Sequence, residues 1–332
     1  MKLRICKINF HDELETSRID RFIMDPNTNG EFINTAKYLS YHSAGKFCED
    51  SVCVEDIDKG AIKCVLMSAS TKEDEDIIIS HPGTTFAGLI FNIRDEIDEM
   101  VKAVGLIEKY YKSDYKKIVL KTSNSHYGNQ PNQKSDYILM KKGYEPGFTA
   151  LANIIDLSNI NEEVEALELY NSRKRNQVRK SIRQNSFSFM ETGDIPEAIW
   201  RNLNMNLKRK YKTQSTHNYS EIVKLQTMFP EKIVPYAAYK SNGDYGAFSL
   251  VYKFKNVFHT QYLDMNYDLS RENPNHFFLH NLILQAMREG YKYFSFGGST
   301  ENGGEYLNEG LFRFKNGFGG GTILLPQYIK EL

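Results

Sequence analysis

Lys315 has sequence neighbours that would suit a closed, charge-stabilising site. It lies in the run Gly310-Leu-Phe-Arg-Phe-Lys-Asn-Gly-Phe-Gly319, which is rich in aromatic residues and glycine. A cation fixed in a dry cleft could neutralise a carboxylate or phosphate, or the oxyanion that develops when an amine attacks an acyl carbonyl. The alternative is a surface lysine beside a turn, and position alone favours that alternative.

Residues that could transfer protons occur on the predicted strand Val257–Met265. Transfer to an amine requires a deprotonated nucleophile, so Asp264 could accept a proton and Tyr262 could donate one to a leaving group. Packing of the tyrosine and a turn at the aspartate are the alternatives. Strand periodicity predicts two faces, one with Thr260, Tyr262 and Asp264 and the other with His259 and Gln261.

Two glycine-bearing segments could approach a cofactor closely. The loop His81-Pro-Gly-Thr-Thr-Phe-Ala-Gly88 follows a predicted strand and precedes a helical pattern. Its backbone N–H groups and the Thr84 and Thr85 hydroxyls could therefore hold a phosphate against the helix dipole. The loop residues proposed to bind a cofactor are His81, Gly83, Thr84, Thr85 and Gly88. In the second segment, Gly297-Gly298 would let a substrate reach a strand end. In both segments, a simple turn is the alternative.

A basic segment could bind phosphate groups. Residues 172–185 contain six Lys and Arg side chains and no acid, and Arg175, Arg179 and Arg183 recur at four-residue spacing on one helical face. Such a face suits a nucleotide diphosphate, the phosphates of coenzyme A or a tRNA backbone. A solvated helix face is the alternative.

Other kinds of site lack their signatures. His276 and His280 are four residues apart, but no acid or cysteine accompanies them at metal-binding spacing, so we expect no metal. The sequence has neither Gly-x-Ser-x-Gly nor a Walker loop, which argues against the usual serine hydrolases and nucleoside triphosphatases.

The elements that must position these residues occur twice. Residues 275–290 predict a helix leading into a strand and then Lys315, and residues 96–112 predict a helix leading into a strand and then Lys141. The separation between Lys141 and Lys315 is almost the same as that between Tyr115 and Tyr291. The sequence therefore predicts a duplicated domain.

Each copy has the same predicted order. Hairpins are predicted at residues 47–68 and 234–254, each followed by a further strand, a loop, a helix and another strand. The fold class is α/β (α+β), with two tandem domains that each contain a mixed, mostly antiparallel sheet flanked by helices. We expect domains at residues 1–150 and 151–332, with a last strand at residues 322–328 that stays in the second domain or crosses to the first.

Composition sets limits on function. The chain has 332 residues, enough for two ordinary domains, and its net charge is +0, so contact with nucleic acid would require a local basic patch. The four cysteines form no Cys-x-x-Cys pair, and reduced thiols are expected. With no signal-peptide pattern and no run of about 18 apolar residues, we expect a cytoplasmic protein without a membrane span.

The predicted order of elements resembles the Gcn5-related N-acyltransferase (GNAT) core, present twice. Residues 275–298 and 310–319 look like the closing signature of FemAB-type transferases. Residues 172–185 look like the basic helix that opens that family's second domain, and residues 81–88 are similar to its first-domain loop. The chain departs from many bridge enzymes of the family at residues 194–227, which predict one or two ordinary helices where those enzymes carry a long helical arm for tRNA.

This resemblance implies an acyl or aminoacyl transferase. Peptidoglycan-bridge enzymes of the family move an amino acid from aminoacyl-tRNA to an amine of a cell-wall precursor, and other relatives use acyl-CoA. Their Phe-Lys-x-Gly-Phe lysine lies in the donor channel, which here implies Lys315, with Phe314, Gly297 and Gly298 beside the donor.

We therefore expect transfer to an amine or hydroxyl of a phosphorylated or sugar-linked acceptor, a small molecule or cell-wall precursor. Acyl-CoA or aminoacyl-tRNA would be the donor. The reaction centre would lie in the second copy, and the first copy would bind. The alternative is a non-catalytic module that binds nucleotide sugars or RNA through its basic helix.

Overall fold

The structure is a computed structural model that describes residues 2–43 and 45–332. Its contacts divide the chain into two compact units. Unit 1 comprises Met1–Ala150, Asn302–Glu305 and Leu324–Leu332, and unit 2 comprises Leu151–Glu301 and Tyr306–Ile323. The chain thus passes from unit 1 to unit 2 at residue 150 and returns near its C-terminal end.

Unit 2 is built on six consecutive strands of a sheet in the order β10-β11-β12-β13-β14-β9. Its helices are α5 (Glu163–Leu169), α6 (Ser172–Gln184), α7 (Glu197–Tyr211), α8 (Tyr219–Met228), α9 (Pro274–Arg288) and α10 (Glu309–Asn316). Its strands are β9 (Glu145–Asp156, which begins in unit 1), β10 (Ser188–Glu191), β11 (Ile233–Tyr239), β12 (Tyr245–Lys253), β13 (Val257–Met265), β14 (Tyr293–Gly298), and the short pair β15 (Thr300–Glu301) and β16 (Tyr306–Leu307). The predicted hairpin is confirmed as β11 and β12, and the predicted helix as α9.

The strands β13 and β14 are the parallel pair of this unit, and α9 connects them. They pair over only three positions, from Val257 opposite Tyr293 to His259 opposite Ser295. Beyond these positions β13 continues to Met265, paired only with β12 on its other side. The two strands are therefore hydrogen-bonded to each other at their beginnings, and their carboxyl ends are not paired with each other.

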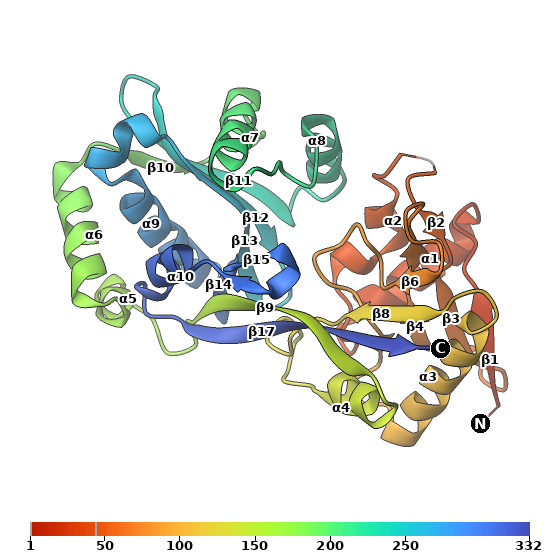
Figure 1. The fold of residues 1–332 in the computed structure, drawn as a ribbon. Coiled ribbons are helices and arrows are strands. Elements are labelled where there is room, and N and C mark those ends of the chain that lie inside the picture. The colour runs from red at the N-terminus through yellow and green to blue at the C-terminus, as the bar shows by residue number, and fades with distance from the viewer. Residues whose placement is uncertain (1, 44) are drawn as a thin grey trace. The chain divides into compact units, whose positions relative to one another are not determined.

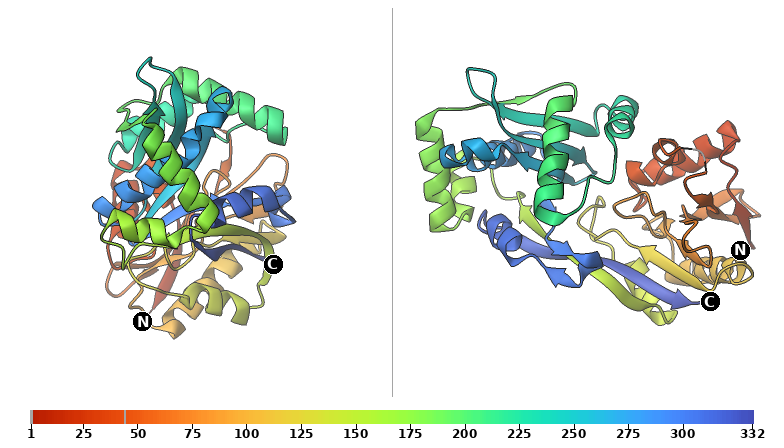
Figure 2. Two further views of the ribbon diagram at one scale, coloured as in Figure 1. Left: turned by 90° about the vertical axis from the view of Figure 1, so that its left-hand side faces the viewer. Right: turned by 45° about the horizontal axis from the view of Figure 1, so that its top comes forward.

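Helices cover both faces of this sheet. Phe258 belongs to the apolar core that α9 completes with Phe278 and Leu282, so α9 covers the face on which Phe258 lies. Trp200 of α7 packs edge-on against Tyr262, on the opposite face. Helix α6 lies beside α9 (Figure 1), and both views of Figure 2 show the same neighbours.

Unit 1 contains two sheets. The first has the order β1-β3-β4-β7, and the second has the order β17-β8-β6-β5-β2. Their strands are β1 (Leu3–Lys7), β2 (Cys48–Glu49), β3 (Val52–Asp56), β4 (Ala61–Leu66), β5 (Ala69–Ser70), β6 (Ile77–Ile79), β7 (Ile90–Phe91), β8 (Lys117–Lys121) and β17 (Gly321–Glu331). The helices are α1 (Glu13–Met24), α2 (Ala36–Leu39), α3 (Ile97–Tyr111) and α4 (Lys134–Lys141).

The core of unit 1 lies between α3 and the sheets. Met100, Val104 and Ile107 of α3 pack with residues of β3, β4 and β8. Strand β17 pairs antiparallel with β8, from Gln327 opposite Lys121 to Glu331 opposite Lys117. Figure 1 shows the two strands side by side. Among the described residues, no helix combines the length and the apolar character needed to cross a bilayer.

Candidate active site in unit 2

Lys315 is buried near the end of α10. Its side chain is 5% exposed, and its Nζ donates hydrogen bonds to the carbonyl oxygens of Gly298 at 2.6 Å and Gly297 at 3.3 Å. Loss of water around the buried amine lowers the pKa of Lys315 to about 7. An ammonium group has three N–H donors, and the third finds no acceptor among the described residues.

The end of β14 is shaped to present these carbonyls. Gly297 has a φ of +69°, a left-handed conformation that glycine adopts without steric cost. The register between β14 and β9 shifts between Ser295 and Gly297, which places this bend at an irregularity in the strand. Gly297 and Gly298 were predicted to let a substrate approach, and in the structure their carbonyls orient Lys315.

His259 lies next to this arrangement. It is 4% exposed, and its Nδ1 is 3.1 Å from the hydroxyl of Ser295 on the neighbouring strand. Burial, together with the charge of Lys315, lowers the pKa of His259 to about 3. The imidazole is therefore neutral at pH 7. A β-carbon on Gly297 would lie 3.4 Å from its Cε1, an ordinary contact, so the left-handed φ rather than the ring favours glycine here.

A β-bulge in β13 changes which side chains share a face. Leu250 lies opposite Tyr262, whereas the next residue of β12, Val251, lies opposite Thr260, so Gln261 is an extra residue. Paired residues point to the same side of a sheet. The predicted alternation is therefore wrong for Thr260, which lies on the face that α9 covers, and for His259, which lies on the opposite face. His259, Tyr262 and Asp264 share the face toward α7.

Asp264 and Tyr262 are held by hydrogen bonds on that face. The Asp264 carboxylate accepts from the side-chain amides of Asn202 at 2.9 Å and Asn206 at 2.8 Å, and from the Tyr245 hydroxyl at 3.1 Å. These three partners are not predictable from the sequence, because asparagines on a helix and a distant tyrosine give no local signal.

The Tyr262 hydroxyl is 2.6 Å from Nδ1 of His217. Burial raises the pKa of Tyr262 to about 12. Its hydroxyl therefore keeps its proton at neutral pH and can act as a hydrogen-bond donor.

A pocket of about 340 Å³ opens beside the end of β13. Asp264 lines it, whereas Lys315 is not among its described lining residues. Its walls come from α7, β13, the start of α9 and α10: Leu203, Asn206, Leu207, Lys210, Leu263, Asp264, Met265, Tyr267, Asn275, Gly310, Leu311 and Phe314. The lining is mainly apolar, with Lys210 as its cation and Asp264 as its acid. Phe314, the residue before Lys315, forms part of the wall.

The three arginines of the predicted phosphate-binding face lie on α6. Arg175 is partly buried and donates to the carbonyl of Tyr170 at 3.0 Å, whereas Arg179 and Arg183 are exposed. None of them is among the described residues that line the pocket of unit 2. The three arginines therefore do not face the pocket that Asp264 lines.

The loop at residues 81–88 in unit 1 differs from the expectation. Strand β7 lies between this loop and α3, which begins only at Ile97, so the loop does not adjoin a helix N-terminus. The expectation that the loop leads directly into a helix is therefore wrong, whereas cofactor binding by the loop residues stays a prediction. His81 is fully buried, and its Nε2 is 3.1 Å from the Glu49 carboxylate.

Hydrogen bonds within unit 1 occupy several polar groups of this loop. The backbone N–H of Gly83 donates to Nδ1 of His81, and the Thr84 hydroxyl donates to the His81 carbonyl. Nζ of Lys121 donates to the Thr84 carbonyl at 2.7 Å. Thr85 is exposed, and Gly88 takes a left-handed φ of +87°. These bonds stabilise the loop itself.

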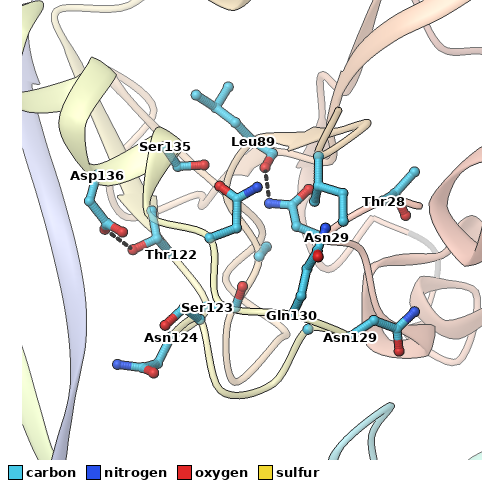
Figure 3. Close-up of a pocket in the computed structure, with 15 residues that line it drawn as sticks. Thr28, Asn29, Leu89, Thr122, Ser123, Asn124, Asn129, Gln130, Ser135 and Asp136 are labelled. Carbon is cyan, nitrogen blue, oxygen red and sulfur yellow. Dashed lines mark hydrogen bonds between the residues drawn. The ribbon is translucent and has the colours of Figure 1, made fainter. Parts of the chain in front are cut away.

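A second, small pocket in unit 1 is lined by amides and hydroxyls (Figure 3). Its volume is about 20 Å³, comparable to one water molecule. Asn29 donates to the carbonyl of Leu89 at 2.9 Å, and the Thr122 hydroxyl donates to Asp136 at 3.4 Å. Its size leaves no room for an acyl group.

Neither unit provides a clustered metal site among the described residues. His280 is 3.0 Å from the Tyr170 hydroxyl through Nδ1 and 3.1 Å from Glu163 through Nε2. Nε2 of His276 is 3.1 Å from Nζ of Lys174. The two histidines thus form separate hydrogen bonds.

Several solved structures are similar to this chain in fold. The crystal structure of FemX is similar over 100% of this chain and 98% of its own length, with a TM-score of 0.70 and 12% identity. The C-terminal domain of a putative lysylphosphatidylglycerol synthetase from Agrobacterium fabrum covers 95% of this chain and 92% of its own, with a TM-score of 0.56 and 12% identity. A tandem GNAT protein from the clavulanic acid biosynthesis pathway covers 99% and 98%, with a TM-score of 0.54 and 10% identity.

No protein-family model and no curated protein sequence matched the chain. At 10–12% identity, these structural similarities establish the fold. The parallel pair β13–β14, the connecting helix α9 and the antiparallel strands before them agree with it. The chain has a FemAB-like fold of tandem GNAT-type domains.

Proposed function

We propose that this protein is an acyl or aminoacyl transferase whose reaction centre lies in unit 2, beside Lys315. The observation that carries the proposal is the buried Lys315 amine, held by two carbonyls where β13 and β14 no longer pair. A buried ammonium with an unused N–H donor is suited to stabilise a developing negative charge. The similarity in fold to FemX and to a tandem GNAT protein supports the same class of reaction.

The proposed chemistry is a direct transfer. The acceptor's amine or hydroxyl attacks the acyl carbonyl, a new C–N or C–O bond forms, and the bond from the acyl carbon to the donor's sulfur or oxygen breaks. The third N–H of Lys315 would donate to the carbonyl oxygen as it becomes an oxyanion. The nucleophile's proton leaves with attack, and the departing thiolate or alkoxide takes up a proton.

Two residues of β13 remain candidates for proton transfer. Asp264 lines the pocket, and its carboxylate already accepts three hydrogen bonds, which fix its orientation. Tyr262 keeps its proton at neutral pH, so we assign it the role of donor to the leaving group. Asp264 is the proposed acceptor of the nucleophile's proton.

The pocket of unit 2 is the proposed site for the acyl portion of the donor. Its apolar lining, including Leu207, Leu311 and Phe314, suits a carbon chain or an amino acid side chain. Lys210 at the same pocket could contact an anionic part of the donor. The donor would be an acyl-CoA or an aminoacyl-tRNA, and unit 1 would bind the phosphorylated or sugar-linked cell-envelope acceptor.

A transfer assay with two donors tests this function. Radiolabelled acetyl-CoA and aminoacyl-tRNA would each be incubated with the protein and amine acceptors, including a nucleotide-linked muramyl peptide. Transfer from either donor that is lost in Lys315→Met supports the proposal. The matched control is Lys102→Met, which removes an exposed lysine of unit 1 that pairs with Asp98. Transfer that persists at the normal rate in folded Lys315→Met would exclude Lys315 from the mechanism.

The exposed arginines of α6 favour a second candidate, a non-catalytic module that binds RNA or nucleotide sugars. Arg179 and Arg183 are exposed on a helix without acidic residues. Tight tRNA binding that weakens steeply with salt and is lost in Arg179→Gln/Arg183→Gln, with no transfer from either donor, would favour this module over the transferase.

A further inference from the structure

Helix α6 turns one of its basic residues inward. Lys174 is 8% exposed, whereas its neighbour Arg173 and the later Arg179, Lys180 and Arg183 are exposed. The helix is capped by Asn171, whose side chain accepts from the Lys174 backbone N–H at 2.9 Å. Most basic side chains of this helix are therefore exposed to solvent, whereas Lys174 is directed into unit 2.

The Lys174 amine contacts the segment that carries Lys315. Its Nζ lies 3.7 Å from the centre of the Phe314 ring and 5.1 Å from that of Phe318. It also lies 3.1 Å from Nε2 of His276, at the start of α9. The rings of Phe314 and Phe318 thus flank a buried amine that is hydrogen-bonded to a histidine.

The protonation of this pair follows from its geometry. A lysine ammonium can only donate, so Nε2 of His276 accepts and the ring proton lies on Nδ1. Burial and the Lys174 charge lower the pKa of His276 to about 3, and burial lowers that of Lys174 to about 8. The ammonium of Lys174 and the neutral ring of His276 therefore coexist at pH 7.

Gly317 provides the space that Lys174 occupies. A β-carbon at Gly317 would lie 2.7 Å from Cγ and 3.0 Å from Cε of Lys174. The φ of Gly317 is −62°, which any residue adopts, so close approach rather than backbone conformation requires glycine here. The Gly317 carbonyl also accepts the backbone N–H of Asn171 at 3.0 Å. The capped start of α6 is thereby joined to the end of α10.

Helix α10 depends on such contacts for its orientation. It has eight residues, too few to be stable by itself in water. Phe314 and Lys315 are adjacent on it, one lining the pocket and the other reaching the Gly297 and Gly298 carbonyls. A rotation that moved Phe314 would therefore also move the Lys315 amine.

We propose that Lys174 is a positioning residue for the reaction, which holds Phe314 through its ring face and so fixes the direction of Lys315. This inference rests on the proposed function for its meaning in catalysis. The structural part of the proposal is that the direction of the Lys315 side chain depends on Lys174. This part does not depend on the identity of the donor or the acceptor.

The test measures the Lys315 amine directly. NMR spectra of protein labelled with ¹³C at lysine Cε would be recorded against pH, with the Lys315 signal assigned by its absence in Lys315→Met. In Lys174→Met the hydrocarbon stem remains, but the contact with Phe314 loses its charge and His276 loses its donor. As α10 loosens and water reaches Lys315, its pKa should rise by roughly one unit or more. Lys180→Met, on the exposed face of α6, should leave it unchanged.

Gly317→Ala provides a second route to the same result. Its new methyl group displaces Lys174 without removing its charge, so the Lys315 signal should shift in the same direction. Unchanged titration of Lys315 in both folded variants would overturn the inference. If Lys174→Met does not fold, Gly317→Ala alone decides. Because the readout requires no turnover, absence of transferase activity would leave this result intact and would count only against the proposed function.

Discussion

The Nζ atom of Lys315 lies 2.6 Å from the carbonyl oxygen of Gly298, so a buried ammonium is anchored by the backbone of a strand end. The contact directs a cation without neutralising it, because a carbonyl carries only a partial charge. A carboxylate partner would have cancelled the charge that an oxyanion requires. The expected properties of Lys315 variants follow from this arrangement.

Replacement of Lys315 by Met should lower kcat by about 10²–10³-fold while KM changes little, as for loss of one donor to a developing oxyanion. Steady-state kinetics with the active donor would measure both constants. Thermal unfolding monitored by circular dichroism would establish that the variant is folded. A large rise in KM at constant kcat would instead indicate a role in binding.

Stability should depend on pH through the same residue. The pKa of Lys315 is about 7 in the folded protein and near 10.5 when unfolded, so between these values the unfolded chain holds a proton that the folded chain has lost. The free energy of unfolding should therefore rise with pH in this window, by up to about 1.4 kcal/mol per pH unit from this group. Urea titrations at pH 7 and 9 should show a smaller rise in Lys315→Met than in the wild type and in Lys102→Met.

The stability of the protein should also depend on pH in acid, through His259. Its pKa is lowered from 6.5 to about 3, so between these values only the unfolded chain binds the proton, and stability falls as pH decreases. His259→Asn should lose less stability than the wild type between pH 7 and pH 5. Equal losses in urea titrations of the two proteins would show that the ring is protonated without difficulty in the folded state.

Gly317 and Lys174 should be energetically coupled. Gly317→Ala should destabilise the wild type by about 1–3 kcal/mol through overpacking, and by less when Lys174→Ala has removed the Cγ and Cε atoms that the new methyl group meets. A double-mutant cycle measured by urea denaturation gives the coupling. Additive losses would mean that the two side chains do not compete for space.

Filling the pocket of unit 2 should impair use of the donor. Leu311→Trp places a large ring at the lining and should lower kcat/KM for the donor by about tenfold or more. Leu324→Trp, at an exposed position of β17, is a suitable control. Equal kinetics for the two variants would place the donor elsewhere.

The periodicity of apolar residues in the sequence was sufficient to predict the architecture. The predicted fold class is confirmed by the mixed sheets and by the tandem GNAT relative. The hairpin at β11–β12 has turn residues between two apolar runs, and α9 has a continuous apolar face, so local sequence determines both. Residues 194–227 form α7 and α8, in agreement with the expected ordinary helices.

Details of the site depended on tertiary structure. The bulge at Gln261 changes the side of the sheet on which Thr260 lies, and no residue type in β13 indicates a bulge. Lys174 and the exposed Lys180 each follow an arginine on α6, and the tertiary contacts with Phe314 and Phe318 explain why Lys174 is buried. The loop that contains His81 leads into a short strand, which its proline and glycine did not reveal.

The division of unit 1 along the chain has a consequence for synthesis. Residues 327–331 pair with β8, which the ribosome produces about 200 residues earlier, and all of unit 2 is made in between. Unit 1 therefore cannot complete its sheet while it emerges, and this edge of β8 stays open until residues 327–331 have been made. An exposed edge of this kind is a site of aggregation. The order of synthesis thus leaves unit 1 with an unpaired strand edge throughout the synthesis of unit 2.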